Sequence, residues 1–257
     1  MKLKSRFYRF IERFLSRFTD RIVCISEAEK ESAVNNNIGN EGKLSLIPNG
    51  IDVQAVTNAK PKSRNELGIT NDTFVVGMVG RISKQKAPDI FIKAAKLVKE
   101  QVPNSAFIIV GDGELRPEIE KYASENNLQL LITGWTDEPY SYLKVFDVAV
   151  LPSRWEGFGL AVVEYMAAGK NVVATRIDAL PTIIDDKVDG LLVEVDSPEN
   201  LCEKIIWLHK HPDEAALMRQ KALTKVIAIY DIHRVAKQHF DMFEQLMDEG
   251  KIVNNLI

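Results

Sequence analysis

Two glutamates enclose the segment of this sequence that is best suited to chemistry, Glu156-Gly-Phe-Gly-Leu-Ala-Val-Val-Glu164. Residues 147–151, just upstream, are apolar after Asp147 and typical of a buried strand. Gly169, just downstream, is a typical helix terminator. We therefore expect Glu156 in a loop and Glu164 about one turn into a helix. Because the helix N-terminus between them can bind an anion, the layout suits a ligand with a phosphate between a sugar and a ribose.

Arg81 and Lys86 are the candidate cations for that phosphate. They follow Gly80 in the turn between a predicted strand and a predicted helix. A guanidinium and an ammonium group there would neutralise a diphosphate leaving group. The alternative is a pair of solvated surface cations, which is the usual state of Lys and Arg. We expect Lys84 to be such a surface cation.

Glu164 has apolar neighbours, among them Val162 and Val163, so its helix is expected to be largely buried. A buried carboxylate needs a partner, and a ribose diol would be one. The alternative is a carboxylate that only stabilises the positive end of the helix dipole.

Glycine-bearing turns also follow two further predicted strands, at residues 111–113 and at 134–136. Each glycine taken alone is explained by a tight turn. Together they converge on the edge of the sheet where the strands end, and ligands of α/β sheets bind at that edge. The sequence has no Asp-x-Asp pair and no cluster with metal-ligand spacing, so we expect neither a metal nor a cofactor.

The elements that must position these residues alternate between strand and helix from about residue 73 onward. This alternation predicts an α/β fold with a doubly wound, Rossmann-like parallel sheet. The expected strands are 74–79, 106–110, 128–132, 147–151, 171–174 and 190–193; the expected helices are 88–100, 114–125, 140–146, one after Gly159, 198–210, 212–228 and 231–249.

The N-terminal segment 3–18 is a predicted basic amphipathic helix, with aromatic residues such as Phe7, Phe10 and Phe14 at helical spacing. Two interpretations stay open: peripheral contact with an anionic membrane surface, or packing on a neighbouring domain or subunit. A short strand is expected at 21–26. Ser26 then begins a helix with a capping box, and a second strand is expected at 44–47.

Composition narrows the class of protein. The chain has 257 residues, is 46% hydrophobic and carries a net charge of −3, which gives no support to nucleic-acid binding. Cys24 and Cys202 lie far apart and are expected to be reduced, buried thiols. No apolar run approaches the roughly 20 residues that span a bilayer. We expect a cytoplasmic protein.

Several of these segments, in this order, resemble the retaining glycosyltransferases of family four (group 1). They are Ile47-Pro-Asn-Gly-Ile-Asp52, Val79-Gly-Arg-Ile82 with Gln85-Lys86, Gly111-Asp-Gly113, and Glu156 to Glu164. The resemblance runs from about residue 20 to the end. It implies the GT-B fold, in which two Rossmann-like domains face each other across a cleft. This chain would supply the C-terminal, donor-binding half, with most of the N-terminal domain missing.

The resemblance also implies a division of the chain and a role for each site residue. Residues 1–47 would be a remnant of the N-terminal acceptor domain, 48–60 a linker, 61–230 the donor-binding domain, and 231–257 a helix that crosses back to the N-terminal domain. The resemblance implies Arg81 and Lys86 at the diphosphate, Glu156 near the transferred sugar, Glu164 at the ribose and Thr136 near the base. Phe158, Gly159 and Leu160 would form the backbone stretch beside sugar and phosphate, and Gly80 and Gly157 complete the implied donor-binding residues. Arg81, Lys86 and Glu156 form the implied catalytic set.

The implied reaction is sugar transfer from a UDP- or GDP-linked donor with retention of configuration and without an essential metal. The acceptor would be a glycan or a lipid-linked sugar in surface polysaccharide or glycolipid synthesis, at the inner face of the membrane. A partner chain could supply the missing domain. The alternatives are a non-catalytic nucleotide-sugar-binding module, a truncated half-enzyme, and an epimerase of the same fold, which the ordered set of Arg81, Lys86 and Glu156 disfavours.

Two features depart from the family pattern. Residues 176–182 read Arg-Ile-Asp-Ala-Leu-Pro-Thr, where the family commonly has a Gly-Gly…Pro-Glu pattern. The missing domain predicts that strand 21–26 has no sheet neighbours. It also predicts exposed apolar residues on helix 231–249, at Val235, Phe240, Phe243, Leu246 and Met247.

Overall fold

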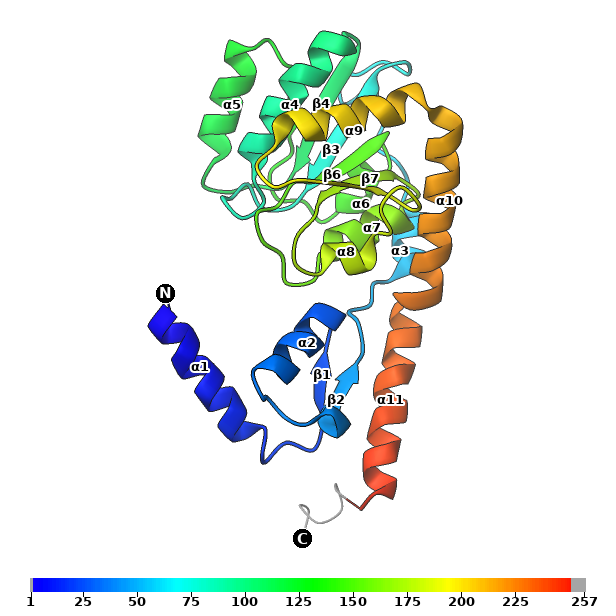
Figure 1. The fold of residues 1–257 in the computed structure, drawn as a ribbon. Helices are drawn as coiled ribbons and strands as arrows, with labels where there is room; N and C mark the ends of the chain where they lie inside the picture. The colour runs from blue at the N-terminus through cyan, green and yellow to red at the C-terminus, as the bar shows by residue number, and fades with distance from the viewer. Residues whose placement is uncertain (1, 251–257) are drawn as a thin grey trace. The chain divides into compact units, whose positions relative to one another are not determined.

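The computed structural model describes residues 2–250, with side chains described from residue 7 onward. The chain forms two compact units, both of which are drawn in Figure 1. One unit combines Met1–Ile51 with Ile229–Ile257, and the other is Asp52–Ala228.

The larger unit contains a six-stranded sheet in which every pair of neighbouring strands is parallel. The order is β5-β4-β3-β6-β7-β8. Their bounds are Phe74–Val79 for β3, Ser105–Val110 for β4, Leu130–Ile132 for β5, Val148–Leu151 for β6, Asn171–Thr175 for β7 and Leu191–Val193 for β8. The chain moves outward from the centre in both directions, so the topological switch point lies between β3 and β6. This confirms the predicted α/β fold.

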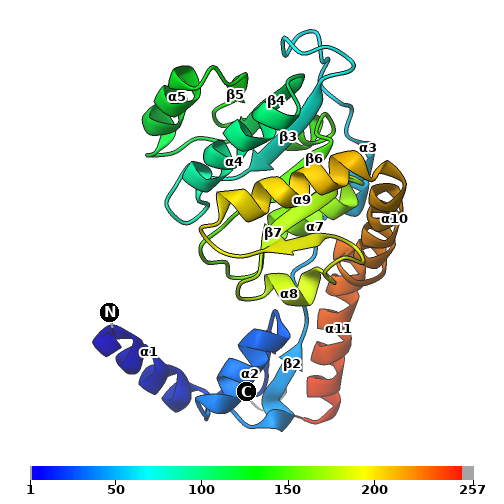
Figure 2. The ribbon, with the colours of Figure 1, turned by 45° about the horizontal axis from the view of Figure 1, so that its top comes forward.

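Helices cover both faces of the sheet (Figures 1 and 2). On one face, α4 (Pro88–Gln101) lies against α9 (Pro198–Lys210) and α5 (Arg116–Glu125). The helix α7 (Leu160–Ala167) packs on β6 and β7, beside the short helices α3 (Val53–Asn58) and α8 (Leu180–Ile183). The helix α6 (Pro139–Leu143) packs on β3 and β4, and α10 (Pro212–Ile229) follows α9.

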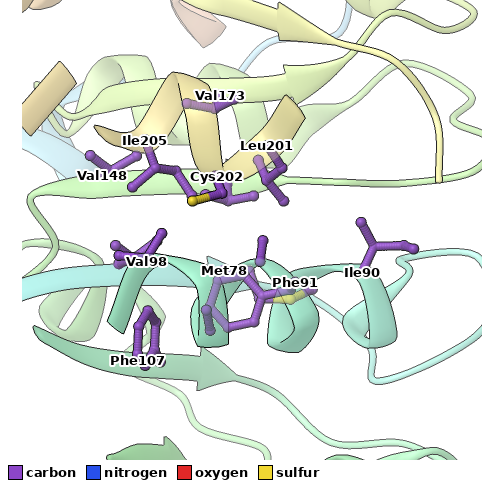
Figure 3. Close-up of a cluster of buried hydrophobic side chains, with 14 of the residues drawn as sticks. Met78, Ile90, Phe91, Val98, Phe107, Val148, Val173, Leu201, Cys202 and Ile205 are labelled. Carbon is purple, nitrogen blue, oxygen red and sulfur yellow. The ribbon is translucent and has the colours of Figure 1, made fainter. Parts of the chain in front are cut away.

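The central strands are buried on both faces, which explains why they read as continuous apolar runs rather than alternating ones. All six residues of β4 are buried. Figure 3 shows the core on the α4 face, where Met78 of β3, Phe91 of α4 and Leu201 of α9 meet. Fully burying such a side chain contributes about 1.5–3 kcal/mol. The sheet is therefore a rigid platform that fixes where each strand ends.

The linker expected at 48–60 contains a helix that the sequence analysis did not predict. Asp52 caps α3 by accepting a hydrogen bond from the Ala55 backbone N–H at 2.8 Å, and Val53 and Val56 are buried. Pro48 and Gly50 mark a turn, as expected. The Asp52 cap just after that turn then begins a helix where a flexible connection was expected. The short helix α8 was also missed.

The smaller unit contains α1 (Lys2–Leu15), β1 (Ile22–Cys24), α2 (Glu27–Asn35), a 3-10 turn at Glu41–Lys43, β2 (Leu44–Leu46) and α11 (Ile232–Asp248). The prediction that the first strand has no sheet neighbour is wrong, because β1 pairs in parallel with β2. Ser26 caps α2 as predicted, by accepting from the Glu29 backbone N–H. The Glu29 carboxylate accepts from the Ile25 backbone N–H rather than from Ser26.

The predicted exposure of apolar residues on α11 is correct for three of the five residues. Val235 and Leu246 are buried, because α11 packs on the β1–β2 layer, where Val235 meets Ile47. Phe240, Phe243 and Met247 are exposed, as expected.

The aromatic residues of α1 are exposed, as are Leu15 and Phe18 at its end. Two of its arginines turn toward α2: Arg9 donates to the Asn36 side chain and Arg13 to the Asn36 carbonyl. Whether this helix contacts a membrane or another domain stays a prediction. Within the part of the chain that the structure describes, no helix is both long and apolar enough to span a bilayer. Both cysteines are free and buried, as predicted.

Candidate active site

The predicted site residues gather at the carboxyl edge of the large sheet, on either side of the switch point. The loop after β3 carries Arg81 and Lys86, and the loop after β6 carries Glu156 and leads into α7. Since β3 and β6 are neighbours in the sheet, these two loops start side by side. The sheet topology therefore brings together residues that lie about 70 positions apart in the sequence.

Lys86 and Glu156 form an ion pair across the switch point, between Nζ and Oε1. The Glu156 side chain is only 6% exposed and that of Lys86 is 19% exposed. The same Oε1 atom also accepts a hydrogen bond from Ser153 Oγ at 2.7 Å. The sequence analysis placed both residues at the site but predicted neither the pair nor the contribution of Ser153. An ammonium group has three N–H donors, so Lys86 can hold Glu156 and still donate to a bound anion.

Arg81 is exposed, and its side chain makes no ion pair or hydrogen bond with any residue in the described part of the chain. Its charge is therefore available to a ligand without the loss of an internal contact. Gly80 ends up beside the lysine: a Cβ atom there would stand 3.6 Å from Lys86 Cε. That distance is an ordinary van der Waals contact, and what favours glycine here is its φ of 151°.

Glu164 lies in α7, as predicted, and its partner is the hydroxyl of Tyr140, which donates to Oε1 at 3.0 Å. Burial raises the pKa of Glu164, while the Tyr140 hydrogen bond and the charge of Lys86 act in the opposite direction. Burial and the neighbouring Glu164 carboxylate raise the pKa of Tyr140 to about 12. Tyr140 thus remains a hydrogen-bond donor at neutral pH. Lys86 acts electrostatically on Glu164 while it binds Glu156, so one ammonium group interacts with both carboxylates.

The N-terminus of α7 has no side-chain cap. Gly159 is the N-cap residue and has a left-handed φ of 99°. Phe158 is buried, Leu160 is 43% exposed, and nothing lies within 4 Å of a Cβ atom built on Gly157. The first backbone N–H groups of a helix lack intrahelical partners, so an uncapped N-terminus between two carboxylate-bearing segments can accept an anion.

Replacing Gly159 by alanine should destabilise the chain by about 2 kcal/mol, because a left-handed φ costs an L-residue roughly 1–2 kcal/mol. The new Cβ atom would also stand 2.4 Å from Cδ2 of the buried Leu180. The matched control is Gly157→Ala, which meets neither obstacle. Urea unfolding of both variants checks this, and equal midpoints for the two would contradict the conformational role of Gly159.

Tyr165 fastens α7 to the end of β3. Its hydroxyl accepts from the Val79 backbone N–H at 2.7 Å and lies 3.2 Å from the Val79 carbonyl, to which it donates. The side chain is fully buried. This contact ties the helix that carries Glu164 to the strand that precedes Arg81. The sequence analysis missed it, because an aromatic residue inside an apolar run gives no sign of its hydroxyl partner.

The remaining loops contribute polar contacts of their own. Thr136 accepts from the Glu138 backbone N–H at 3.1 Å, just before α6 begins. Its predicted place near the base stays a prediction. Asp178, in the segment that departs from the family pattern, accepts from the Glu156 backbone N–H at 2.8 Å. Among the described residues, no three His, Cys, Asp or Glu side chains gather as a metal site.

Comparisons with known proteins agree with this geometry. The family model described as glycosyl transferases group 1 matches residues 59–225. A second model, described as glycosyltransferase family 4, matches residues 1–55. The first match lies within the larger unit. The second lies mainly in the smaller unit.

Two relatives illustrate the similarity in sequence. A UDP-Gal:alpha-D-GlcNAc-diphosphoundecaprenol alpha-1,3-galactosyltransferase from Escherichia coli is 34% identical over 207 residues, which are 77% of this chain and 54% of the relative. An uncharacterized glycosyltransferase from Methanocaldococcus jannaschii is 33% identical over 203 residues, covering 78% of this chain and 52% of its own length. The chain thus spans about half the length of these relatives.

Solved structures show the same fold. The crystal structure of Alr3699/HepE from Anabaena in complex with UDP superposes with a TM-score of 0.82 at 22% identity, covering 90% of this chain and 65% of that one. The C-terminal domain of a glycosyl transferase group 1 family protein (LpcC) from Francisella tularensis has a TM-score of 0.63 at 27% identity. It covers 71% of this chain and is itself covered completely.

Proposed function

The chain belongs to the group 1 glycosyl transferases, and from that premise we propose that it binds a nucleotide diphosphate sugar and transfers the sugar with retention of configuration and without an essential metal. The observation that carries the proposal is the Lys86–Glu156 pair at the switch point, together with an exposed Arg81 in the same loop as Lys86 and an uncapped α7 N-terminus after Glu156. A diphosphate there would receive the Arg81 guanidinium, the remaining N–H donors of Lys86 and the first N–H groups of α7.

The proposed donor lies across this edge. Arg81, Lys86 and the first N–H groups of α7 receive the diphosphate, because charge-assisted hydrogen bonds favour such groups. Glu164 accepts from the ribose hydroxyls, with Tyr140 holding its carboxylate in place. Glu156 faces the transferred sugar.

In the proposed reaction, the bond between the anomeric carbon and the diphosphate oxygen breaks, and a bond to the acceptor oxygen forms on the same face of the sugar. The acceptor hydroxyl gives its proton to the departing phosphate oxygen. Negative charge grows on that phosphate in the transition state, and preorganised cations stabilise such charge most effectively. Arg81 and Lys86 therefore take the part that a divalent metal plays in other transferases.

The base and the acceptor are proposed from the E. coli relative, whose name specifies UDP-galactose and a sugar linked to a lipid diphosphate. We assign UDP as the nucleotide and a glycan or lipid-linked sugar as the acceptor, in surface polysaccharide or glycolipid synthesis. Acceptor binding is assigned to the part of the relatives that this chain does not span, supplied by a longer form of the chain or by a companion chain.

Product analysis tests the reaction. The chain is incubated with UDP-galactose and a lipid-diphosphate-linked N-acetylglucosamine, alone and with the separately expressed N-terminal half of the E. coli relative, in EDTA or in magnesium chloride. We expect an α-linked product by NMR, formed at the same rate in both buffers. A β-linked product, or strict dependence on magnesium, would contradict the mechanism. Donor binding without product in any mixture would favour a non-catalytic binding module.

A further inference from the structure

Arg154 joins three loops at the carboxyl edge, although the sequence analysis gave it no role. Its guanidinium forms a two-pronged ion pair with Asp89, with Nη1–Oδ1 at 3.0 Å and Nη2–Oδ2 at 2.6 Å. Its Nε donates to Asp196 Oδ1 at 2.6 Å, and Nη1 also donates to the Lys84 carbonyl at 3.0 Å. Asp89 is the second residue of α4 and Asp196 follows β8, so one side chain connects the segments after β3, β6 and β8.

The backbone on either side of Arg154 is fastened to the same loop. The Arg154 N–H donates to the Gln85 carbonyl at 2.8 Å, and Gln85 Nε2 donates to the Trp155 carbonyl at 3.0 Å. Gln85 immediately precedes Lys86, and Trp155 immediately precedes Glu156. The contacts of Arg154 with Asp89, Asp196, Lys84 and Gln85, together with the Gln85–Trp155 contact, form a clasp between these loops. Gln85 and Trp155 are each one residue away from a partner of the Lys86–Glu156 ion pair.

The chemistry of the clasp favours a fixed geometry. The Arg154 side chain is only 18% exposed, and its guanidinium donates four N–H···O hydrogen bonds. Burial by itself would raise the pKa of Asp89, but Arg154 outweighs it and lowers that pKa, so the carboxylate stays ionised at neutral pH. A planar guanidinium matches this set of acceptors, whereas the ammonium of lysine cannot form the two-pronged contact.

We propose that Arg154 is a positioning residue: through Asp89 and the Lys84 carbonyl it holds the loop of residues 81–87 against the Glu156 loop, so that Arg81 and Lys86 are preorganised for the donor diphosphate. This role rests on the proposed function. It goes further by assigning diphosphate affinity to a side chain that does not itself contact the donor. The ribose end of the site, at Glu164, is held by a hydrogen bond from the Tyr140 hydroxyl, which takes no part in the contacts of Arg154.

Because different hydrogen bonds hold the two ends of the site, the role of Arg154 can be tested selectively. In Arg154→Gln, UDP affinity measured by calorimetry should fall about tenfold or more, as expected when charged contacts lose their preorganisation. The affinity for uridine, measured by competition NMR, should change less than about twofold, since Tyr140 and not the loop of residues 81–87 makes the hydrogen bond to Glu164. The Lys86 and Ala87 backbone N–H groups both donate to the Ser83 carbonyl. In the ligand-free protein, their hydrogen exchange should be faster in Arg154→Gln than in the wild type.

Arg64→Gln is the matched control, because Arg64 joins Thr73, Val145 and Asp147 in a comparable cluster at the opposite edge of the sheet. It should lower stability and leave the ratio of UDP to uridine affinity unchanged. Asp89→Asn, which keeps the shape of the side chain, replaces Arg154→Gln if that variant does not fold. It should lower UDP affinity selectively in the same way.

Wild-type UDP affinity in a folded Arg154→Gln or Asp89→Asn chain would overturn this role and leave the proposed function standing. An equal loss of UDP and uridine affinity would also overturn it, since that result indicates general damage. A wild-type chain that binds no UDP would overturn the proposed function and, with it, the role given to Arg154.

Discussion

Replacing Lys86 by methionine is expected to weaken UDP binding by about 10- to 150-fold, since a hydrogen bond to a charged group contributes roughly 1.5–3 kcal/mol. It should also destabilise the chain by on the order of 3 kcal/mol, because a buried carboxylate loses its partner. That carboxylate is Glu156, 6% exposed, which retains only the Ser153 hydroxyl among its described side-chain partners. Calorimetry measures the first effect and urea unfolding the second.

The control for Lys86 is Lys84→Met, in the same loop. The Lys84 side chain is exposed and only its backbone carbonyl takes part in the contacts of the site. We expect little change in either measurement. A second variant, Glu156→Gln, should recover the stability that Lys86→Met loses when the two are combined, because no unpaired charge remains. If Lys84→Met and Lys86→Met weaken UDP binding equally, the cation assignment is wrong.

Glu164→Gln should act in opposite directions on binding and on stability. It removes the charged acceptor for the ribose hydroxyls, so UDP affinity should fall by about tenfold or more, in line with the energy of a hydrogen bond to an ionised group. It also removes a buried charge, so the variant should be more stable than the wild type at pH 7. The Tyr140 hydroxyl can still donate to the amide oxygen.

The pH dependence follows from the direction of the pKa shift. Burial raises the pKa of Glu164 in the folded chain above the unfolded value of 4.5. The folded state therefore holds the proton more tightly, and the wild type loses stability as the pH rises from 4.5 through the folded pKa. The advantage of Glu164→Gln should be absent below pH 4.5 and should grow as the pH rises through the folded pKa. Urea unfolding at several pH values measures it, and a pH-independent difference between the two chains would contradict the assignment.

The fold and most of the site positions could be predicted from the sequence, because both depend on local patterns. The strands are continuous apolar runs buried between helices, and Gly159 and Gly169 mark the two ends of α7. The strand order places the loops after β3 and β6 together, so the grouping of Arg81, Lys86 and Glu156 at one sheet edge was foreseeable. The roles of these residues toward a donor remain proposals.

What the sequence could not show are the partners of these side chains. Tyr140 meets Glu164, and Asp178 meets the Glu156 backbone, only because separate loops converge in space. No spacing in the sequence encodes such contacts. The same holds for β1, which was expected to have no sheet neighbour: its partner β2 lies beyond α2 and a 3-10 turn, and the parallel pairing appears only once α2 folds back.

The central claim is that the carboxyl edge of the large sheet binds a nucleotide diphosphate through Arg81 at one end and Glu164 at the other. Calorimetric titration of the chain with UDP, GDP and ADP, alongside Arg81→Ala and Glu164→Ala, tests it most directly. Neither substitution removes a partner from a buried charge, so both variants should fold. The account predicts saturable binding of UDP that is lost or strongly weakened in both variants. UDP binding that neither substitution changes would contradict it.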